Sequence, residues 1–284
     1  MLAAGGVTQA VALDAAKRPT QYVFEHWDTA NGLPVAGVKA IARTPDGFLW
    51  LGTEEGLVRF DGVEFRTFDL HQQHLGDVNA LFVDRGGALW LATTGGAARW
   101  LGDRVDPTAT YSTTNGLRDN RVEAMAQDAS GVMWIGTAGG LHRLTNGALA
   151  TITTHSGLPH DHVQALLVAS DGRLWIGTNG GIARLSHGAI EPGSATTGLP
   201  HASVLALHED ASGTIWIGTF AGLARARSGV IVDEVFPLRR SRAPVNGLAT
   251  DHDGSLWIGT YGEGLVRWRD GRTERFAKGD GLAD

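Results

Sequence analysis

The sequence contains no cysteine among its 284 residues. This absence excludes disulfide bonds, thiolate catalysis and cysteine-ligated zinc. Charged residues make up only 19% of the chain, the formal net charge is −6, and no run of lysine or arginine exceeds a pair. A mildly acidic chain repels phosphate backbones, so we expect no nucleic-acid partner. No stretch approaches the roughly 18 consecutive apolar residues that a membrane-spanning helix needs.

The first twenty residues read as a region separate from the rest. Met1 to Leu13 are mostly small and apolar, and Ala10-Val11-Ala12 has the form of a signal-peptidase site. The apolar stretch is short and no basic segment precedes it, so the complete pattern of a signal peptide is not present. We interpret residues 1–20 as an N-terminal tail, either disordered or the remnant of a signal peptide that begins upstream.

Glycine and tryptophan are abundant, with 40 and nine residues, and six of the tryptophans mark an internal repeat. Each has a glycine three positions earlier and is followed by an aliphatic residue, by Gly or Ala, and then by Thr. A second glycine opens the next segment, with an arginine three residues after it. The marker tryptophans, spaced 40, 44, 41, 41 and 41 residues apart, are Trp50, Trp90, Trp134, Trp175, Trp216 and Trp257.

Each repeat reads as four short strands. An apolar segment such as Val163–Leu167 is followed by an Asp-Gly-type turn, the Leu-Trp-Ile-Gly-Thr strand, the Gly-Leu-x-Arg strand and a more polar strand such as Glu64–Phe68. Four antiparallel strands every ~40 residues are typical of a propeller blade, whereas the turns of a β-solenoid are usually shorter. The sequence therefore predicts an all-β fold, a β-propeller of four-stranded antiparallel blades with six repeats over residues 21–284.

The repeated residues have structural interpretations in such a fold. We expect the tryptophans to pack between blades and the glycine two residues later to mark a close approach of neighbouring sheets. The arginines are expected to pack their stems on the next blade and to pair with acidic or carbonyl groups, or else to line a charged ring for an anionic ligand. The acidic residues six positions before the tryptophan are expected to form turn hydrogen bonds; they are Asp84, Asp128, Asp210 and Asp251.

The two ends of the repeat region are out of phase with each other. Tyr22–Trp27 matches the fourth strand of later repeats, and Gly281–Asp284 repeats the phrase that elsewhere introduces a new repeat. We expect the six repeats to belong to a larger ring of seven or more blades; a complete six-bladed ring with Tyr22–Trp27 as an extra strand is the alternative. An open ring would expose two blade faces, and homodimerisation or aggregation through them is then expected.

The segments Trp27–Pro34 and Asp46–Gly62 resemble the two-component regulator propeller repeat, and the likeness recurs in register from about Tyr22 to Asp284. In that family the propellers form the periplasmic sensor region of bacterial histidine kinases and GGDEF diguanylate cyclases. The resemblance implies a periplasmic, non-catalytic sensor without a cofactor, which binds a small molecule, a glycan-like ligand or another protein domain. The second repeat departs from the pattern at Ala92 and Ala97.

In a propeller, the turn between the second and third strands and the link to the next blade emerge on one face. The sequence varies at these places while the framework repeats, as a specific site requires. We therefore predict a ligand site on this face and no catalytic or metal-binding residue. The candidate ligand-binding residues are Arg118, Asp119, His160, Asp161, His201, Phe220, Tyr261 and Glu263.

Two other functions stay open. An enzyme of the streptogramin-lyase type, with a histidine-based site and a divalent metal, would draw on His160, His201 and His208. A soluble interaction scaffold in the manner of WD-repeat proteins would have a stable protein partner, although the repeats lack the Gly-His and Trp-Asp pattern of that family. The sequence has no serine-nucleophile motif, no phosphate-binding glycine loop and no kinase or cyclase signature.

Overall fold

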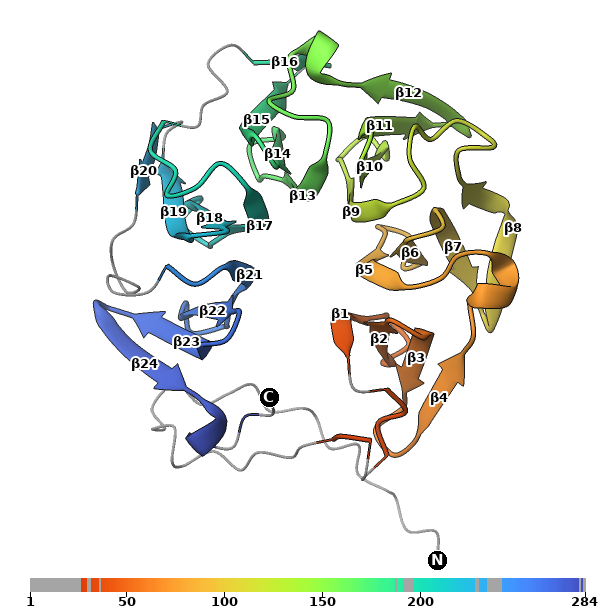
Figure 1. Cartoon of the computed structure of the whole chain (residues 1–284), viewed down its shortest axis with the longest axis horizontal. Helices are drawn as coiled ribbons and strands as arrows, with labels where there is room; N and C mark the ends of the chain where they lie inside the picture. Colours follow the sequence, from red (N-terminus) through yellow and green to blue (C-terminus); the bar gives the residue numbers. More distant parts are fainter. Residues whose placement is uncertain are drawn as a thin grey trace, which may run out of the picture.

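The structure is a computed structural model, and it describes residues 27–29, 32–35, 37–186, 188–191, 197–227, 230–233, 242–280 and 282. Within these ranges the chain forms 24 β-strands, grouped into six four-stranded antiparallel sheets around a common axis (Figure 1). The predicted β-propeller of six four-stranded blades is confirmed. The predicted tail, residues 1–20, and most of the predicted leading strand Tyr22–Trp27 lie outside the described residues.

Each blade runs in chain order from an inner strand to an outer strand (Figure 1). Blade one is β1 (Val38–Arg43), β2 (Leu49–Thr53), β3 (Gly56–Phe60) and β4 (Phe65–Phe68), and blade two is β5 (Val78–Val83), β6 (Leu89–Thr93), β7 (Ala97–Leu101) and β8 (Arg104–Tyr111). Blade three is β9 (Val122–Gln127), β10 (Met133–Thr137), β11 (Gly140–Thr145) and β12 (Ala148–Ile152), and blade four is β13 (Val163–Val168), β14 (Leu174–Thr178), β15 (Gly181–Ser186) and β16 (Ala189–Ile190). Blade five is β17 (Val204–Glu209), β18 (Ile215–Thr219), β19 (Gly222–Arg227) and β20 (Val230–Asp233), and blade six is β21 (Val245–Thr250), β22 (Leu256–Thr260), β23 (Gly264–Arg269) and β24 (Arg272–Phe276).

The hydrophobic core consists of layers between consecutive blades. Trp175 of blade four, for example, is buried in one cluster with Ile215 and Ile217 of blade five. Trp50, Trp90, Trp134 and Trp216 occupy the same place in the layers between the other consecutive blades. A tryptophan side chain buries a large apolar area with few rotatable bonds, so it holds two sheets at a fixed separation. The predicted role of the tryptophans in inter-blade packing is confirmed.

The glycine two residues after the tryptophan marks the closest approach between blades. A Cβ built on Gly177 would lie 2.6 Å from Cγ1 of Val204, the first residue of the next inner strand. Gly52, Gly136 and Gly218 face the first valine of the following blade in the same way. Only hydrogen fits at these positions, because carbon atoms in contact need roughly 3.5–4.0 Å. The predicted close approach is confirmed.

The acidic residue six positions before the tryptophan organises the turn between the first two strands. In blade five, Asp210 accepts hydrogen bonds from the backbone amides of Ser212 and Thr214, and its second oxygen accepts one from Nε1 of Trp216 at 2.8 Å. Asp84, Asp128 and Asp251 make the same set of bonds in their blades. The prediction that these residues are turn hydrogen-bonders is confirmed.

We expect Asp210→Ala to lower the free energy of unfolding by about 2 kcal/mol, because the buried indole N–H of Trp216 then loses its acceptor. Burial raises the pKa of Asp210, but the hydrogen bonds from Ser212 and Trp216 outweigh it, and the net pKa is lowered. The contribution is therefore present above the unfolded pKa and is lost as the pH falls through the folded pKa. Urea unfolding at pH 7 measures the effect, with the exposed Glu55→Ala as control. Equal midpoints for the two variants would contradict the assignment.

The first and sixth blades are more exposed than the others on the faces that have no consecutive blade beside them. Ile41 on β1 is 64% exposed, and Trp257 is only half-buried, unlike the five preceding marker tryptophans. A Cβ on Gly259 would meet nothing closer than Gly247 of its own blade, at 3.7 Å. Figure 1 shows a gap between β1 and β21, whereas the inner strands of consecutive blades pack together from β1 through to β21. The larger ring and the pairing of blade faces stay predictions.

Candidate functional site

One face of the propeller is built by hydrogen bonds between the links and the turns. In five blades the residue that follows the last Thr of the second strand donates its backbone N–H to the carbonyl of the residue just before the first strand of the same blade. Asn179 donates to His162 in this way at 3.1 Å, and Phe220 donates to Ser203 at 3.0 Å. Blades two, three and six contain the same bond. Links and turns therefore share one face, as predicted.

The predicted residues Arg118 and Asp119 lie in the link to blade three and pack on its turn. Their Cβ atoms would both lie 3.1 Å from a Cβ on Gly139. Asp119 accepts a hydrogen bond from the backbone amide of Arg121 at 2.8 Å. The backbone amide of Arg118 points at Nε2 of His142 at 3.5 Å. The Asp119 carboxylate thus orders the link, and the charge of the Arg118 guanidinium acts on His142, whose pKa it helps to lower.

The link to blade four carries His160 and Asp161. Nδ1 of His160 accepts a hydrogen bond from the backbone amide of His162 at 2.9 Å. Asp161 accepts one from the amide of Thr154 at 2.7 Å, at the start of the short 3₁₀ helix η3 (Thr154–Ser156). In the link to blade five, His201 repeats the arrangement by accepting from the amide of Ser203 at 3.0 Å. These bonds give the links a defined shape.

The turns contribute the aromatic candidates. Phe220 is 55% exposed and its ring centroid lies 5.4 Å from that of His201. Tyr261 is 74% exposed in the corresponding turn of blade six, and Glu263 pairs with Arg275 at 3.2 Å. The structure thus joins His201 with Phe220. Both exposed rings offer apolar area for contact with a ligand or partner.

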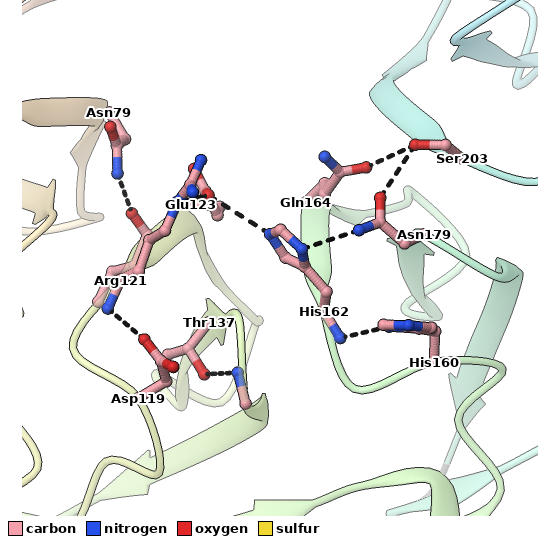
Figure 2. Close-up of polar contacts among 12 residues, drawn as sticks. Asn79, Asp119, Arg121, Glu123, Thr137, His160, His162, Gln164, Asn179 and Ser203 are labelled. Atoms are coloured by element: carbon pink, nitrogen blue, oxygen red, sulfur yellow. Dashed lines mark hydrogen bonds and ion pairs between the residues drawn. The ribbon is translucent and has the colours of Figure 1, made fainter.

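A row of polar side chains that sequence reasoning did not single out runs around the axis on this face. Each pair in the row joins the second residue of one inner strand to the residue that precedes the next inner strand. Lys39 contacts Asp77 at 3.1 Å. Glu123 contacts His162 at 3.4 Å, and Ser203 donates to Gln164 at 3.0 Å. Figure 2 shows the part of this axial polar row that belongs to blades three to five.

His162 is the centre of the row (Figure 2). The amide nitrogen of Asn179, in the turn of the same blade, lies 2.8 Å from its Nδ1. The amide oxygen of Asn179 lies 3.0 Å from Oγ of Ser203, whose single hydroxyl hydrogen it shares with Gln164. With the Asn179 amide as donor, Nδ1 is the acceptor and Nε2 carries the proton that points to Glu123. Both ring nitrogens are engaged, so this histidine has no free lone pair for a general base.

The carboxylate of Glu123 is held in its charged form. Burial raises its pKa, but the hydrogen bond from His162 and the charge of Arg121, whose Nε lies 2.5 Å from Oε1, outweigh burial and bring the pKa below its usual value. A half-buried carboxylate that is ionised and paired offers an acceptor for a hydroxyl or amine of a ligand. The row as a whole presents alternating donors and acceptors to whatever enters from the axis.

A signal for the axial polar row exists in the sequence. Every repeat begins its inner strand with valine, and the ladder with the second strand has an irregularity at the next residue, which takes that side chain out of the regular alternation. The residues after the valine are Lys39, Asn79, Glu123, Gln164, Leu205 and Asn246. The predicted link residues, such as Asp161 and His201, precede members of this row by one or two positions.

The three histidines of the lyase alternative do not converge. His201 precedes β17, and His208 is the fifth residue of that six-residue strand, so the two lie near its opposite ends. His208 is half-buried, and its Nε2 lies 3.0 Å from Oγ1 of Thr250. Within the described ranges, no group of three or more His, Asp or Glu side chains is placed to hold a metal ion.

A family model described as two-component regulator propeller matches five segments of the chain, residues 32–55, 116–139, 157–180, 198–221 and 241–262. Each segment spans a link, the inner strand and the second strand of one blade. Five of the six blades thus contain a two-component regulator propeller repeat. None of the five segments falls in blade two, which departs from the repeat at Ala92 and Ala97.

Solved structures share the arrangement of these repeats. The extracellular domain of a hybrid two-component system from B. thetaiotaomicron is 25% identical with a TM-score of 0.72. The match covers 86% of this chain and 35% of that domain. A second extracellular domain from the same organism is 21% identical with a TM-score of 0.70, covering 86% and 33%. The chain thus spans about a third of the length of these two domains. No curated protein gives a significant sequence match.

Virginiamycin B lyase from Staphylococcus aureus, in a catalytically inactive variant bound to quinupristin, has a TM-score of 0.70. It is 16% identical and the match covers 84% of both chains. At this identity the likeness concerns the fold alone.

No helix in the described part of the chain is long and apolar enough to cross a membrane.

Proposed function

We propose that the chain is a ligand- or partner-sensing propeller from the extracytoplasmic part of a bacterial two-component or diguanylate cyclase receptor, and that it senses without catalysing. The observation that carries the proposal is the axial polar row, set on the face where the variable links and turns meet. Its framework repeats from blade to blade, while its side chains differ at each position. A sensor needs such unlike groups on a like scaffold to recognise one ligand.

Three features support a binding role over chemistry. The His162 ring is fully hydrogen-bonded, between Asn179 and Glu123. The candidate aromatics Phe220 and Tyr261 are exposed in turns on the same face as the row. Two extracellular domains of hybrid two-component systems share the fold over 86% of this chain, which favours a periplasmic or extracellular location.

A calorimetric titration tests the proposal. A thermal-shift screen of small molecules first finds a compound that raises the melting temperature, because a ligand that binds only the folded state stabilises it. We expect the compound to bind saturably, and His162→Ala to weaken its Kd at least tenfold through loss of the contacts with Glu123 and Asn179. His252→Ala is the matched control, since His252 lies in a turn at the other end of its blade and pairs locally with Asp253 at 3.2 Å.

Two results would overturn the proposal. Equal Kd values for His162→Ala and the native chain would remove the axial polar row as the site. Metal-dependent opening of a cyclic lactone such as quinupristin, lost in His201→Ala, would establish the lyase alternative. A stable protein partner that binds the row instead of a small molecule would keep the sensory role and identify the input as a protein.

A further inference from the structure

The turn between the first two strands differs in blade four. In the other blades the marker tryptophan donates its indole N–H to a side chain six positions earlier, at 2.8–3.1 Å. The donor–acceptor pairs are Trp50 and Thr44, Trp90 and Asp84, Trp134 and Asp128, Trp216 and Asp210, and Trp257 and Asp251. In blade four this position is Ala169. Nε1 of Trp175 has no hydrogen-bond partner among the described residues, although the side chain is only 4% exposed.

A cavity of about 430 Å³ opens at this point, between blades four and five. Ala169 and Trp175 line it from blade four, and Glu209 and Ile215 line it from blade five. The sister tryptophans point Nε1 at the side chain six positions earlier, so the same placement in blade four directs the N–H of Trp175 toward the Ala169 methyl in the wall of the cavity. An unpartnered buried donor is costly, so an acceptor that reaches it from the cavity gains binding free energy. The volume lies within the usual range of ligand pockets, about 300–1,000 Å³.

The charges around the cavity select the class of ligand. Two guanidiniums, Arg173 and Arg184, face three carboxylates, Asp171, Glu191 and Glu209. Both guanidiniums are already paired, Arg173 with Glu191 at 2.8 Å and Arg184 with Glu191 at 3.1 Å. An anion entering here meets net negative charge and no free cation, so it is disfavoured.

A hydroxyl group matches both kinds of partner that the cavity offers, the indole donor and the carboxylate acceptors. Its oxygen accepts from the indole of Trp175, and its hydrogen donates to a carboxylate such as Glu209, which already accepts from Ser170 at 2.6 and 2.7 Å. The guanidinium of Arg184 stacks over the Trp175 ring at 5.5 Å, which fixes the ring and its N–H. We infer that the cavity between blades four and five is a binding site for an uncharged, hydroxyl-bearing small molecule.

This site is separate from the axial polar row. Ala169 lies in the turn that leads into β14, and Asn179 lies just beyond the end of the same strand. The two positions are therefore at opposite ends of the blade, on opposite faces of the propeller. The inference does not depend on the proposed function, and loss of one site leaves the other testable.

Titration of the nine tryptophan indole resonances by ¹H–¹⁵N NMR tests the site, with Trp175→Phe used to assign the Trp175 resonance. The probes are glycerol, inositol and glucose as uncharged polyols, and acetate as a carboxylate. We expect at least one polyol to shift the Trp175 resonance saturably, and acetate to leave it in place. Ala169→Asp, which restores the acceptor of the sister blades, is expected to abolish the shift and to raise the melting temperature by about 2–4 °C.

Ala129→Asp is the matched control, because it adds the same charge to the corresponding turn of blade three at an exposed position. It should leave the response of Trp175 to the polyol unchanged. If Ala169→Asp does not fold, Ala169→Asn offers the same acceptor oxygen without charge. The inference fails if no polyol moves the Trp175 resonance saturably, if acetate moves it instead, or if the response survives both substitutions at Ala169.

Discussion

Gly177→Val is expected to lower the free energy of unfolding by at least about 3 kcal/mol. The first added carbon alone would lie 2.6 Å from Cγ1 of Val204, 3.1 Å from its Cβ and 3.2 Å from Cβ of Ala165. The residues concerned are all in the packed interior, Val204 being fully buried. Overpacking a well-packed core forces backbone shifts and usually costs 1–3 kcal/mol, and more for a branched side chain in a rigid sheet contact. Blade four and blade five must then separate along their inner strands.

Gly259→Val is the matched control for this prediction. Gly259 holds the same place in the second strand of blade six, but its nearest neighbours are atoms of Gly247 at 3.7 Å. Valine also has a high strand propensity, so the change at Gly259 should be close to neutral. Chemical unfolding of both variants measures the difference. Similar losses at Gly177 and Gly259 would show that the effect comes from the β-strand backbone and not from contact between blades.

The second large effect is a dependence of stability on pH that arises from His142. This side chain is fully buried in β11, between the hydroxyls of Thr137 at 3.3 Å and Thr151 at 3.0 Å. Burial, with a smaller contribution from the charge of Arg118, lowers the pKa of His142 from 6.5 to about 4. The imidazole of His142 is therefore protonated below about pH 6.5 in the unfolded state, but only below about pH 4 in the folded state.

The sign of the effect follows directly. Above pH 6.5 both states hold a neutral imidazole and stability is constant. As the pH falls below 6.5 the unfolded state binds the proton first, so stability decreases until the folded pKa of about 4 is reached. With these two values we expect the free energy of unfolding to fall by about 2 kcal/mol between pH 7 and pH 5.

His142→Val removes this dependence while keeping the blade packed, because Val58 and Val266 occupy the corresponding positions of blades one and six. Urea unfolding at pH 7 and pH 5 should show a smaller loss for the variant than for the native chain, by about 2 kcal/mol. His155→Ala, at an exposed position, should retain the native loss. His208, whose pKa burial also lowers, contributes equally to all three proteins and cancels in the comparison. An unchanged loss in His142→Val would contradict the assignment.

The fold was predictable because its information is local and repeated. The Gly-x-x-Trp spacing, the Asp-Gly-type turns and the alternation of apolar residues recur in each of six units, so each copy supports the same interpretation. The roles of Gly177, Trp175 and Asp210 also followed, since each belongs to the repeated framework. The prediction that links and turns share one face was confirmed for the same reason, because strand order decides which turns and links emerge together.

The site was predictable only as a region. His160 and Asp161 were predicted for their place in a variable link. In the structure both side chains accept backbone hydrogen bonds that hold that link in shape. Glu123 and His162 lie 39 residues apart and meet only because blades three and four are neighbours. No local pattern reports such a pair.

The sequence by itself determined the number of repeats, the four-strand blade and the residues that hold consecutive blades together, because these depend on short-range spacing. Tertiary structure alone decided which polar side chains meet across blades, and which buried donor lacks an acceptor. Ala169 illustrates the reason. One small residue in a turn is unremarkable in the sequence, and its consequence becomes visible only where Trp175 and the next blade enclose the space that its sister carboxylates fill.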